Sequence, residues 1–373
     1  MVVIVGLNTL FFRCFFASIK MNKNKLIQLF NGLVMVVSCW SVLHSSFSDA
    51  ATTLQWQHTT LSTQPSLRGS AMLGDSLWVS GTNNSVWNSQ DGGKTWHNRS
   101  VRSEVDTDFR DIALFDEKTA IVMGVGSGKQ SALYLTEDAG NTWQLLYQNT
   151  DPTGFFDSIA FWDRQHGLLM GDPVDGYYVV KSTQDGGKTW QRIAKNKLPA
   201  IQEDEAAFAA SGHTLIVGQA NQAWLTTGGK SASVYHSVDS GQSWTRKKVP
   251  LFNRTATAGG YGLALNQNQQ LFVVGGDYQQ RDAIYPNMAR FSQNRWLSVP
   301  SGQRGLRTAM KCVPAVCIAT GKTGNDVSYD QGDTWQPLIN PQSSLAGYYT
   351  VASDNNRFLL AGSDGKIAIV TLL

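Results

Sequence analysis

An eight-residue motif that recurs five times constrains the fold of this chain more than any other feature of its sequence. Each copy reads Ser/Thr-x-Asp-x-Gly-x-Thr/Ser-Trp. The aspartate and tryptophan of each copy are Asp91 and Trp96, Asp138 and Trp143, Asp185 and Trp190, Asp239 and Trp244, and Asp330 and Trp335. Self-similar segments at a nearly regular period predict one supersecondary unit per repeat, with neighbouring units burying a shared core.

The residue types of the motif are those of a tight turn between two strands. An aspartate carboxylate can accept backbone N–H bonds within the turn, and the glycine tolerates a positive φ. The hydroxyl side chains can add short hydrogen bonds to the backbone, and the tryptophan can open the next strand and bury its ring against a neighbouring unit. We therefore interpret the five aspartates as structural and not as catalytic residues.

The spacing of the tryptophans predicts seven units. The motif tryptophans from Trp96 to Trp244 follow one another after 47, 47 and 54 residues, Trp296 ends a degenerate copy 52 residues later, and Trp335 follows after 39. A seventh unit in residues 346–373 has expected strands at 348–352, 357–361 and 366–372 but no motif. Residues 53–57 can supply its missing outer strand, which would close the ring and remove two sheet edges. The expected fold is an all-β, seven-bladed β-propeller.

Composition and charge agree with this fold and exclude one class of partner. The 373 residues include 35 Gly, 12 Trp and 11 Tyr, and only 16% are charged. The formal net charge of +3 comes from residues 1–50, because the rest of the chain balances 27 basic against 27 acidic residues. A nucleic-acid partner would need a basic surface, so we predict no nucleic-acid binding.

Residues 1–50 are predicted to be an N-terminal extension and a signal peptide. A basic segment at 21–25, an apolar stretch at 26–43 and small residues at Ser48 and Ala50 fit a cleavage site after Ala50 and a start at Met21. The propeller would then occupy residues 51–373 and be periplasmic or secreted. In one alternative Cys39 lies in a loose lipobox and carries a lipid anchor; in another the segment is retained as a membrane anchor. No transmembrane span is expected in the mature chain.

The remaining cysteines predict a disulfide and no cofactor. Cys312 and Cys317 lie five residues apart in an exported chain, where a disulfide is the expected state. The six histidines show no spacing typical of metal ligands. We therefore predict no metal site and no cofactor.

A second repeat points to a candidate site. Each unit begins with an expected inner strand in which an alanine is followed by a larger residue. The residues three positions before these alanines are Arg68, Arg110, Asp157, Asp204, Tyr261, Leu306 and Tyr349. A purely structural repeat would tolerate a small or apolar residue there throughout. We expect these positions to lie near the axis of the propeller.

Loops in the later units should reach the same face, because the motif turns lie on the opposite one. These loops are residues 171–176, 275–285 and 321–326. The candidate binding residues on this axial face are Arg68, Arg110, Asp172, Asp175, Glu205, Tyr261, Asp277, Tyr278, Arg307, Asn325 and Tyr349. Arg307 is one position out of register unless a bulge re-aims it. In the structural alternative, Arg and Asp side chains of adjacent inner strands simply pair around a narrow channel.

The motif is the Asp box, and over residues 51–373 the chain resembles the photosystem II stability and assembly factor family. That family lies within the sialidase-like superfamily of Asp-box (bacterial neuraminidase repeat) propellers. Residues 171–176, 205–211, 275–278 and 326–330 also look like bacterial members. The resemblance implies a role in the assembly or stability of a membrane complex. Nothing in the sequence indicates a photosynthetic host.

We expect an exported, monomeric and non-enzymatic propeller that binds a protein or peptide. Arg68, Arg110 and Arg307 would pair with carboxylates of the partner, because guanidinium forks match carboxylates. Tyr261, Tyr278 and Tyr349 would add amphipathic contact area.

The alternative function is that of a sialidase-like glycoside hydrolase. It would use the arginines for a substrate carboxylate, Tyr261 or Tyr349 as nucleophile, and Glu205 or Asp172 as acid. The segment 67–70 departs from the F/Y-R-I-P pattern of sialidases, and the sequence shows no convincing Tyr–Glu couple. An oxidoreductase lacks a GxGxxG fingerprint, and residues 124–129 only imitate a phosphate-binding loop.

Overall fold

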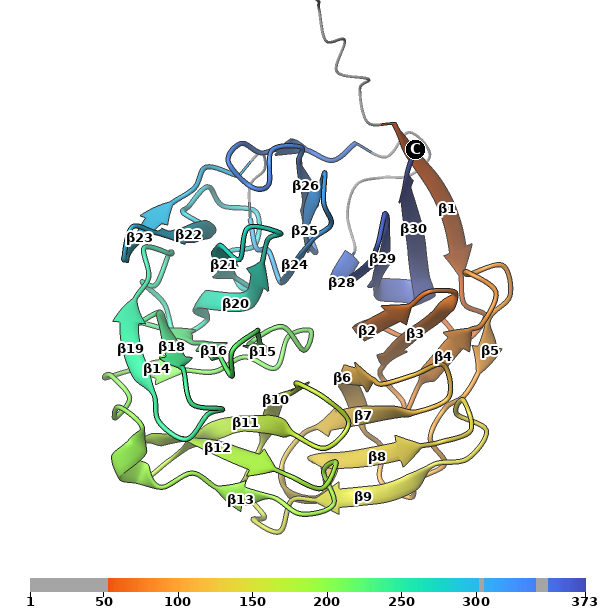
Figure 1. The fold of residues 1–373 in the computed structure, drawn as a ribbon, viewed down its shortest axis with the longest axis horizontal. Helices are drawn as coiled ribbons and strands as arrows, with labels where there is room; N and C mark the ends of the chain where they lie inside the picture. Colours follow the sequence, from red (N-terminus) through yellow and green to blue (C-terminus); the bar gives the residue numbers. More distant parts are fainter. Residues whose placement is uncertain (1–52, 302–304, 340–347) are drawn as a thin grey trace, which may run out of the picture. The chain divides into compact units, whose positions relative to one another are not determined.

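In the computed structural model, residues 53–301, 305–339 and 348–373 are described, and residues 53–373 form one compact unit. The predicted signal peptide and Cys39 lie outside the described residues. The unit is a seven-bladed β-propeller, as the repeat spacing predicts, and Figure 1 shows its sheets arranged around a common axis. No helix among the described residues is long and apolar enough to cross a membrane.

Each blade is an antiparallel sheet whose first strand lies nearest the axis (Figure 1). Blade 1 consists of β2 (Leu67–Leu73), β3 (Ser76–Gly81), β4 (Val86–Ser89) and β5 (His97–Asn98). Blade 2 consists of β6 (Asp108–Leu114), β7 (Ala120–Val125), β8 (Ala132–Thr136) and β9 (Gln144–Gln148). Blade 3 consists of β10 (Phe156–Phe161), β11 (Gly167–Val174), β12 (Tyr177–Thr183) and β13 (Gln191–Arg192). Blades 4 and 5 consist of β15 (Leu215–Val217), β16 (Ala223–Thr226), β18 (Ser233–Ser237) and β19 (Thr245–Lys248); and β20 (Ala258–Leu265), β21 (Leu271–Asp277), β22 (Met288–Ser292) and β23 (Arg295–Ser298). Blades 6 and 7 consist of β24 (Ala309–Cys312), β25 (Cys317–Gly321), β26 (Gly324–Ser328) and β27 (Gln336–Pro337); and β28 (Tyr348–Asp354), β29 (Arg357–Gly362), β30 (Lys366–Leu372) and β1 (Leu54–Thr60).

The ring is closed by the first strand, β1, as predicted. It pairs antiparallel with β30, from Leu54 opposite Leu372 to Thr60 opposite Lys366. The two ends of the described chain thus share one sheet. Closure in this way covers the outer edge of β30, which would otherwise be unpaired.

The prediction that residues 203–208 form the inner strand of blade 4 is wrong. Residues 203–208 contribute only β14 (Glu205–Ala206), which pairs with β17 (Gly228–Gly229) at the edge of the blade 5 sheet. The inner strand of blade 4 is β15, seven residues further on than Phe208. The intervening run of small residues lacks the alternation of a half-buried strand, and it crosses toward the axis instead.

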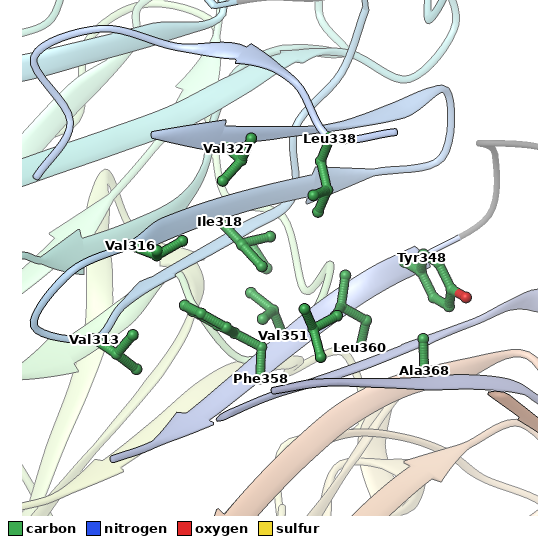
Figure 2. Close-up of a cluster of buried hydrophobic side chains, with 12 residues drawn as sticks. Val313, Val316, Ile318, Val327, Leu338, Tyr348, Val351, Phe358, Leu360 and Ala368 are labelled. Carbon is green, nitrogen blue, oxygen red and sulfur yellow. The ribbon is translucent and has the colours of Figure 1, made fainter. Parts of the chain in front are cut away.

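The core is divided among the interfaces between blades. Figure 2 shows one such interface, where Val316, Ile318 and Val327 of blade 6 face Val351 and Phe358 of blade 7. All five side chains are buried. Removing a buried ring such as that of Phe358 costs about 3–5 kcal/mol in general, so each interface contributes strongly to the stability of the ring.

The five repeated turns form closed hydrogen-bond networks of the expected kind. In the third copy, Asp185 accepts from the Thr189 amide at 2.9 Å and from the Thr189 hydroxyl at 2.6 Å. The Thr183 hydroxyl donates to Asp185 and accepts from the Gly187 amide, and the Trp190 indole donates to the Gly187 carbonyl. The carboxylate pattern recurs at Asp91, Asp138, Asp239 and Asp330. These aspartates are fully engaged in the turn.

The turn glycines let each motif pack on the preceding blade. Gly241 has φ of 81°, and a Cβ atom there would lie 2.7 Å from Leu168 of blade 3. In the same way a Cβ at Gly332 would meet the ring of Phe272 at 2.5 Å. Blade 5, whose copy of the motif is degenerate, joins β22 and β23 through Gln293 and Asn294, both with positive φ. The motif is therefore both a turn and a contact between blades.

Cys312 and Cys317 form a disulfide bond. The two residues lie directly opposite each other in the pairing of β24 with β25. The bond therefore joins the first two strands of blade 6 at the turn that connects them, residues 313–316.

Candidate functional site

The inner strands of five blades carry an irregularity at the same point. In the pairing of the first strand with the second, one residue is skipped in each of these blades. The skipped residues are Arg68, Arg110, Asp157, Tyr261 and Tyr349. A β-bulge bends the strand and re-aims the side chain of the extra residue. All five of these side chains line a single pocket of about 410 Å³.

We call this cavity the axial pocket. Besides the five bulge residues it is lined by Phe155, Asp172, Ala207, Phe208, Ala209, Ala210, Tyr278, Arg281, Leu306, Thr308 and Lys322. Its walls combine cationic, acidic and aromatic groups, and six blades and the segment before β15 contribute. Pockets of several hundred Å³ with a few convergent polar groups are the usual form of ligand sites.

The segment before β15, residues 207–213, crosses the centre of the ring and lines one side of the pocket. We call it the axial segment. The Ala209 carbonyl accepts from Arg110 of blade 2 at 2.6 Å, and the Gly212 carbonyl accepts from Ser158 of blade 3 at 3.2 Å. Ser211 donates to the Thr308 carbonyl, and the His213 ring lies 3.0 Å from the Val351 carbonyl of blade 7. Contacts to four blades hold this segment at the axis.

Arg68 is a cation of the pocket that forms no ion pair among the described residues. Its guanidinium lies 4.2 Å from the centre of the Tyr349 ring, and its Nε has no hydrogen-bond partner among the described residues. Burial and the nearby charge of Arg110 lower the pKa of Arg68. Arg110, by contrast, is paired with Asp108 at 2.8 Å and with the Ala209 carbonyl.

The acidic groups of the pocket are Asp157 and Asp172. Asp157 is only 1% exposed, and its Oδ2 has no hydrogen-bond partner within the described part of the chain. Burial and the neighbouring charge of Asp172 raise the pKa of Asp157 well above its usual value, against the influence of Arg110. Burial also raises the pKa of Asp172.

The aromatic side of the pocket is a stack. Phe208 of the axial segment lies parallel to Tyr261 with ring centres 4.4 Å apart, and Tyr278 meets Phe208 edge-on at 6.4 Å. Tyr261 is buried and donates its hydroxyl to the Thr257 carbonyl. Tyr278 is 47% exposed and lies at the rim.

Six of the eleven candidate residues line the axial pocket: Arg68, Arg110, Asp172, Tyr261, Tyr278 and Tyr349. The other five, Asp175, Glu205, Asp277, Arg307 and Asn325, do not, and the structure corrects their assignment. Arg307 and Asp326 form an ion pair at 2.7 Å with both side chains completely buried. The structural alternative, internal pairing of Arg with Asp, therefore describes Arg307. Asn325 is buried against the Thr320 hydroxyl.

The remaining corrections also follow from hydrogen bonding. Asp175 is an exposed turn residue with φ of 51° whose carboxylate contacts Lys195. Asp277 is buried and accepts from the hydroxyls of Thr255 and Thr257. Glu205 is buried, and its carboxylate accepts from the Gln202 amide and the Thr227 hydroxyl outside the pocket.

Glu205 nevertheless reveals a Tyr–Glu couple that the sequence did not. Its carboxylate accepts from Tyr235 at 3.2 Å, and Arg246 lies 3.6 Å away. Tyr235 has no exposed surface, and neither residue lines the axial pocket. The couple therefore stabilises the buried side of blade 4.

Sequence reasoning missed Asp157, Phe155, Phe208, Arg281 and Lys322 as lining residues. Asp157 occupied the same repeat position as Arg68 and could have been selected on that signal. The others lie on segments whose course depends on the bulges and on the axial segment. Among the described residues, no group of three or more His, Cys, Asp or Glu side chains could hold a metal ion.

Comparisons with solved structures show the fold. YCF48 bound to D1 peptide is 17% identical with a TM-score of 0.61, covering 85% of this chain and 96% of that one. YCF48 from Cyanidioschyzon merolae is 16% identical with a TM-score of 0.59, covering 84% and 98%. A catalytically inactive virginiamycin B lyase from Staphylococcus aureus, with quinupristin, is 13% identical with a TM-score of 0.64, covering 86% and 100%. At such identities the similarity extends to the propeller alone.

No curated protein matches this sequence. The family model described as the DUF6242 beta propeller domain matches residues 17–286, which is more than half of the chain. This chain therefore belongs to the family of DUF6242 β-propeller domains.

Proposed function

We propose that this protein is a non-enzymatic binding propeller whose axial pocket takes a peptide segment of a partner protein, with a carboxylate of the partner against Arg68. The observation that carries the proposal is the state of Arg68, whose buried Nε has no hydrogen-bond partner among the described residues. Buried polar atoms are normally paired, and an unpaired one points to a ligand or an ordered water. A carboxylate matches a guanidinium in charge and in shape.

The other pocket walls suit a peptide. The stacked rings of Phe208 and Tyr261 and the exposed ring of Tyr278 offer a surface for apolar side chains at the mouth. Aromatic residues with a polar tip are enriched in protein interfaces. One similar propeller, YCF48, is described as bound to a D1 peptide, which supports peptide recognition by this fold.

The pocket gives less support to the glycoside hydrolase alternative. Tyr261 donates its hydroxyl to a carbonyl and is stacked on Phe208. Burial raises the pKa of Tyr261, so its hydroxyl is harder to ionise than that of a free tyrosine. A tyrosine nucleophile needs a carboxylate beside it, whereas the Tyr235–Glu205 couple is enclosed in the core. We keep assistance to a membrane complex, implied by the family resemblance, as the biological setting of the binding function.

Export through residues 1–50 is part of this proposal. The disulfide between Cys312 and Cys317 supports it, because disulfides persist in oxidising compartments. Sequencing the amino terminus of the protein from its native envelope tests it. A start at Ala51 agrees with cleavage by signal peptidase, and a lipid-modified Cys39 supports the anchored alternative. Material that retains residues 21–50 would overturn export by cleavage.

The binding proposal is tested with a random peptide library displayed on phage and selected on the immobilised protein. The affinities of selected peptides are then measured by fluorescence anisotropy for the wild type, Arg68→Gln and Arg164→Gln. Arg164 is a matched control, because it also lies over an aromatic ring, Phe115, but is paired with Glu137 and does not line the axial pocket.

We expect the selected peptides to contain an acidic residue or a free carboxyl end. Arg68→Gln should weaken them by about tenfold or more, the loss typical of a charged hydrogen bond, and Arg164→Gln should have no effect. Peptides that bind Arg68→Gln as tightly as the wild type would overturn the proposal.

A further inference from the structure

We propose that Asp157 and Asp172 form a second subsite in the axial pocket, which binds an ammonium or guanidinium group of the same peptide that Arg68 anchors. This inference rests on the proposed function and adds the class of ligand: a peptide that carries both charges. Both carboxyl groups line the pocket. They lie on β10 and β11 of blade 3, whereas Arg68 lies on β2 of blade 1.

The first argument is the isolation of Asp157. It is 1% exposed, it borders the pocket, and its Oδ2 lacks a hydrogen-bond partner among the described residues. A buried carboxyl group without a donor is costly, by an amount that grows when it is ionised. A donor supplied by a ligand removes this cost, and a cationic donor removes most of it.

The second argument is that the cation whose charge acts on Asp157, Arg110, is already paired with other groups. Its nitrogens donate to Asp108 and to the Ala209 carbonyl, each within 2.8 Å. Asp108 is therefore paired with a cation, whereas neither Asp157 nor Asp172 has an ion-pair partner among the described residues.

The third argument is electrostatic. Asp157 interacts electrostatically with Asp172 on β11 and with Arg110 on β6. The buried hydroxyl of Tyr178 on β12 also interacts electrostatically with both carboxyl groups. Burial and this like-charge pairing raise the pKa of Asp157 well above its usual value. An empty pocket therefore favours a proton on the pair, and an organic cation would take the place of that proton.

The two subsites together define an orientation for the ligand. The cationic and acidic sides are separated by blade 2, with Arg110 between them on β6. A peptide with opposite charges at a matching distance would fit in one direction only. Like charges in the wrong subsite would be repelled, which gives specificity against reversed binding.

The subsite is tested by a double-mutant cycle between the protein and a peptide selected as described above. The cationic group has two possible sources, a basic side chain and the free amino end. One peptide therefore carries norleucine in place of its lysine or arginine, and another is acetylated at its amino end. Each is titrated against the wild type, Asp157→Asn and Asp172→Asn, and thermal unfolding confirms that the variants are folded.

Asp175→Asn is the matched control, because Asp175 follows the same strand but is exposed and paired with Lys195 outside the pocket. We expect that removing the cation weakens binding to the wild type and to Asp175→Asn by about tenfold or more. For Asp157→Asn or Asp172→Asn, removing the cation from the peptide should lower the binding affinity by about twofold or less.

An equal loss in the wild type and in both pocket variants would overturn the acidic subsite. That result would leave the proposed function in place as long as Arg68→Gln still weakens the peptide. Selected peptides without any cationic group would likewise overturn the subsite. If Arg68→Gln has no effect on any selected peptide, the proposed function itself fails.

Discussion

Arg68 and Tyr349 occupy the same bulge position in neighbouring blades, and the guanidinium of one lies 4.2 Å from the ring centre of the other. Blade 7 is completed by β1, the strand that directly precedes blade 1 in the chain. The contact therefore joins the first and the last blade in the wall of the pocket. The cation–π contact positions the arginine, while its Nε has no hydrogen-bond partner among the described residues.

The first prediction concerns this contact. Tyr349→Leu should weaken the binding of the selected peptides by about 2- to 30-fold, because a cation over an aromatic ring contributes about 0.5–2 kcal/mol to its positioning. Tyr349→Phe keeps the ring and should retain the affinity of the wild type. Fluorescence anisotropy of both variants measures the difference. Equal losses in the two variants would show that the hydroxyl group and not the ring positions Arg68.

The second prediction concerns the repeated turns. Asp185→Asn should lower the free energy of unfolding by about 1–3 kcal/mol, since one acceptor oxygen is replaced by an NH2 group that cannot accept from Thr189 and the other loses its charge. Gln184→Ala, in the same turn but exposed, should change it by less than about 0.5 kcal/mol. Denaturant titration followed by tryptophan fluorescence gives both values. A neutral Asp185→Asn would contradict the structural role of the motif.

The third prediction is that the difference in unfolding free energy between the wild type and Asp185→Asn depends on pH. Hydrogen bonds from Thr189 lower the pKa of Asp185 to about 2, below its value in the unfolded chain. A lowered pKa stabilises the fold above the unfolded value, near 4, and the effect disappears as the pH falls through the folded value. The gap in unfolding free energy between wild type and Asp185→Asn should therefore narrow between pH 4 and pH 2. A gap that stays constant to pH 2 would show that the carboxylate charge is not involved.

The fourth prediction concerns closure of the ring. Removing residues 53–60 deletes β1 and exposes the edge of β30, including the partners of Trp56 and Gln57. We expect loss of cooperative thermal unfolding and concentration-dependent association through the free edge. A protein that begins at residue 53 is the control and should unfold as one unit. A shortened protein that remains monomeric with an unchanged melting temperature would contradict the role of β1.

Much of the architecture could be predicted from the sequence, because the repeated turn sets both the period and the strand order. The seven blades and the closure by residues 53–57 follow from the positions of six tryptophans and one unit without a motif. Blade 4 was misplaced because its inner strand, Leu215–Val217, is short and follows a run of small residues. That run became the axial segment, whose contacts come from four other blades.

The site was only partly predictable, for a physical reason. The repeat position of Arg68, Arg110, Tyr261 and Tyr349 was visible in the sequence, but the bulges that turn these side chains toward the pocket depend on pairing with the second strand. Arg307 and Asp277 have the same chemistry as pocket residues. Their burial and their partners, Asp326 and two threonines, depend on tertiary contacts that no local pattern records.

The most direct test of the account is a crystal structure of the protein with a selected peptide. The account predicts a peptide carboxylate within hydrogen-bonding distance of Arg68, inside the pocket lined by Tyr349 and Phe208. A peptide bound elsewhere on the propeller, with the axial pocket unoccupied, would contradict it.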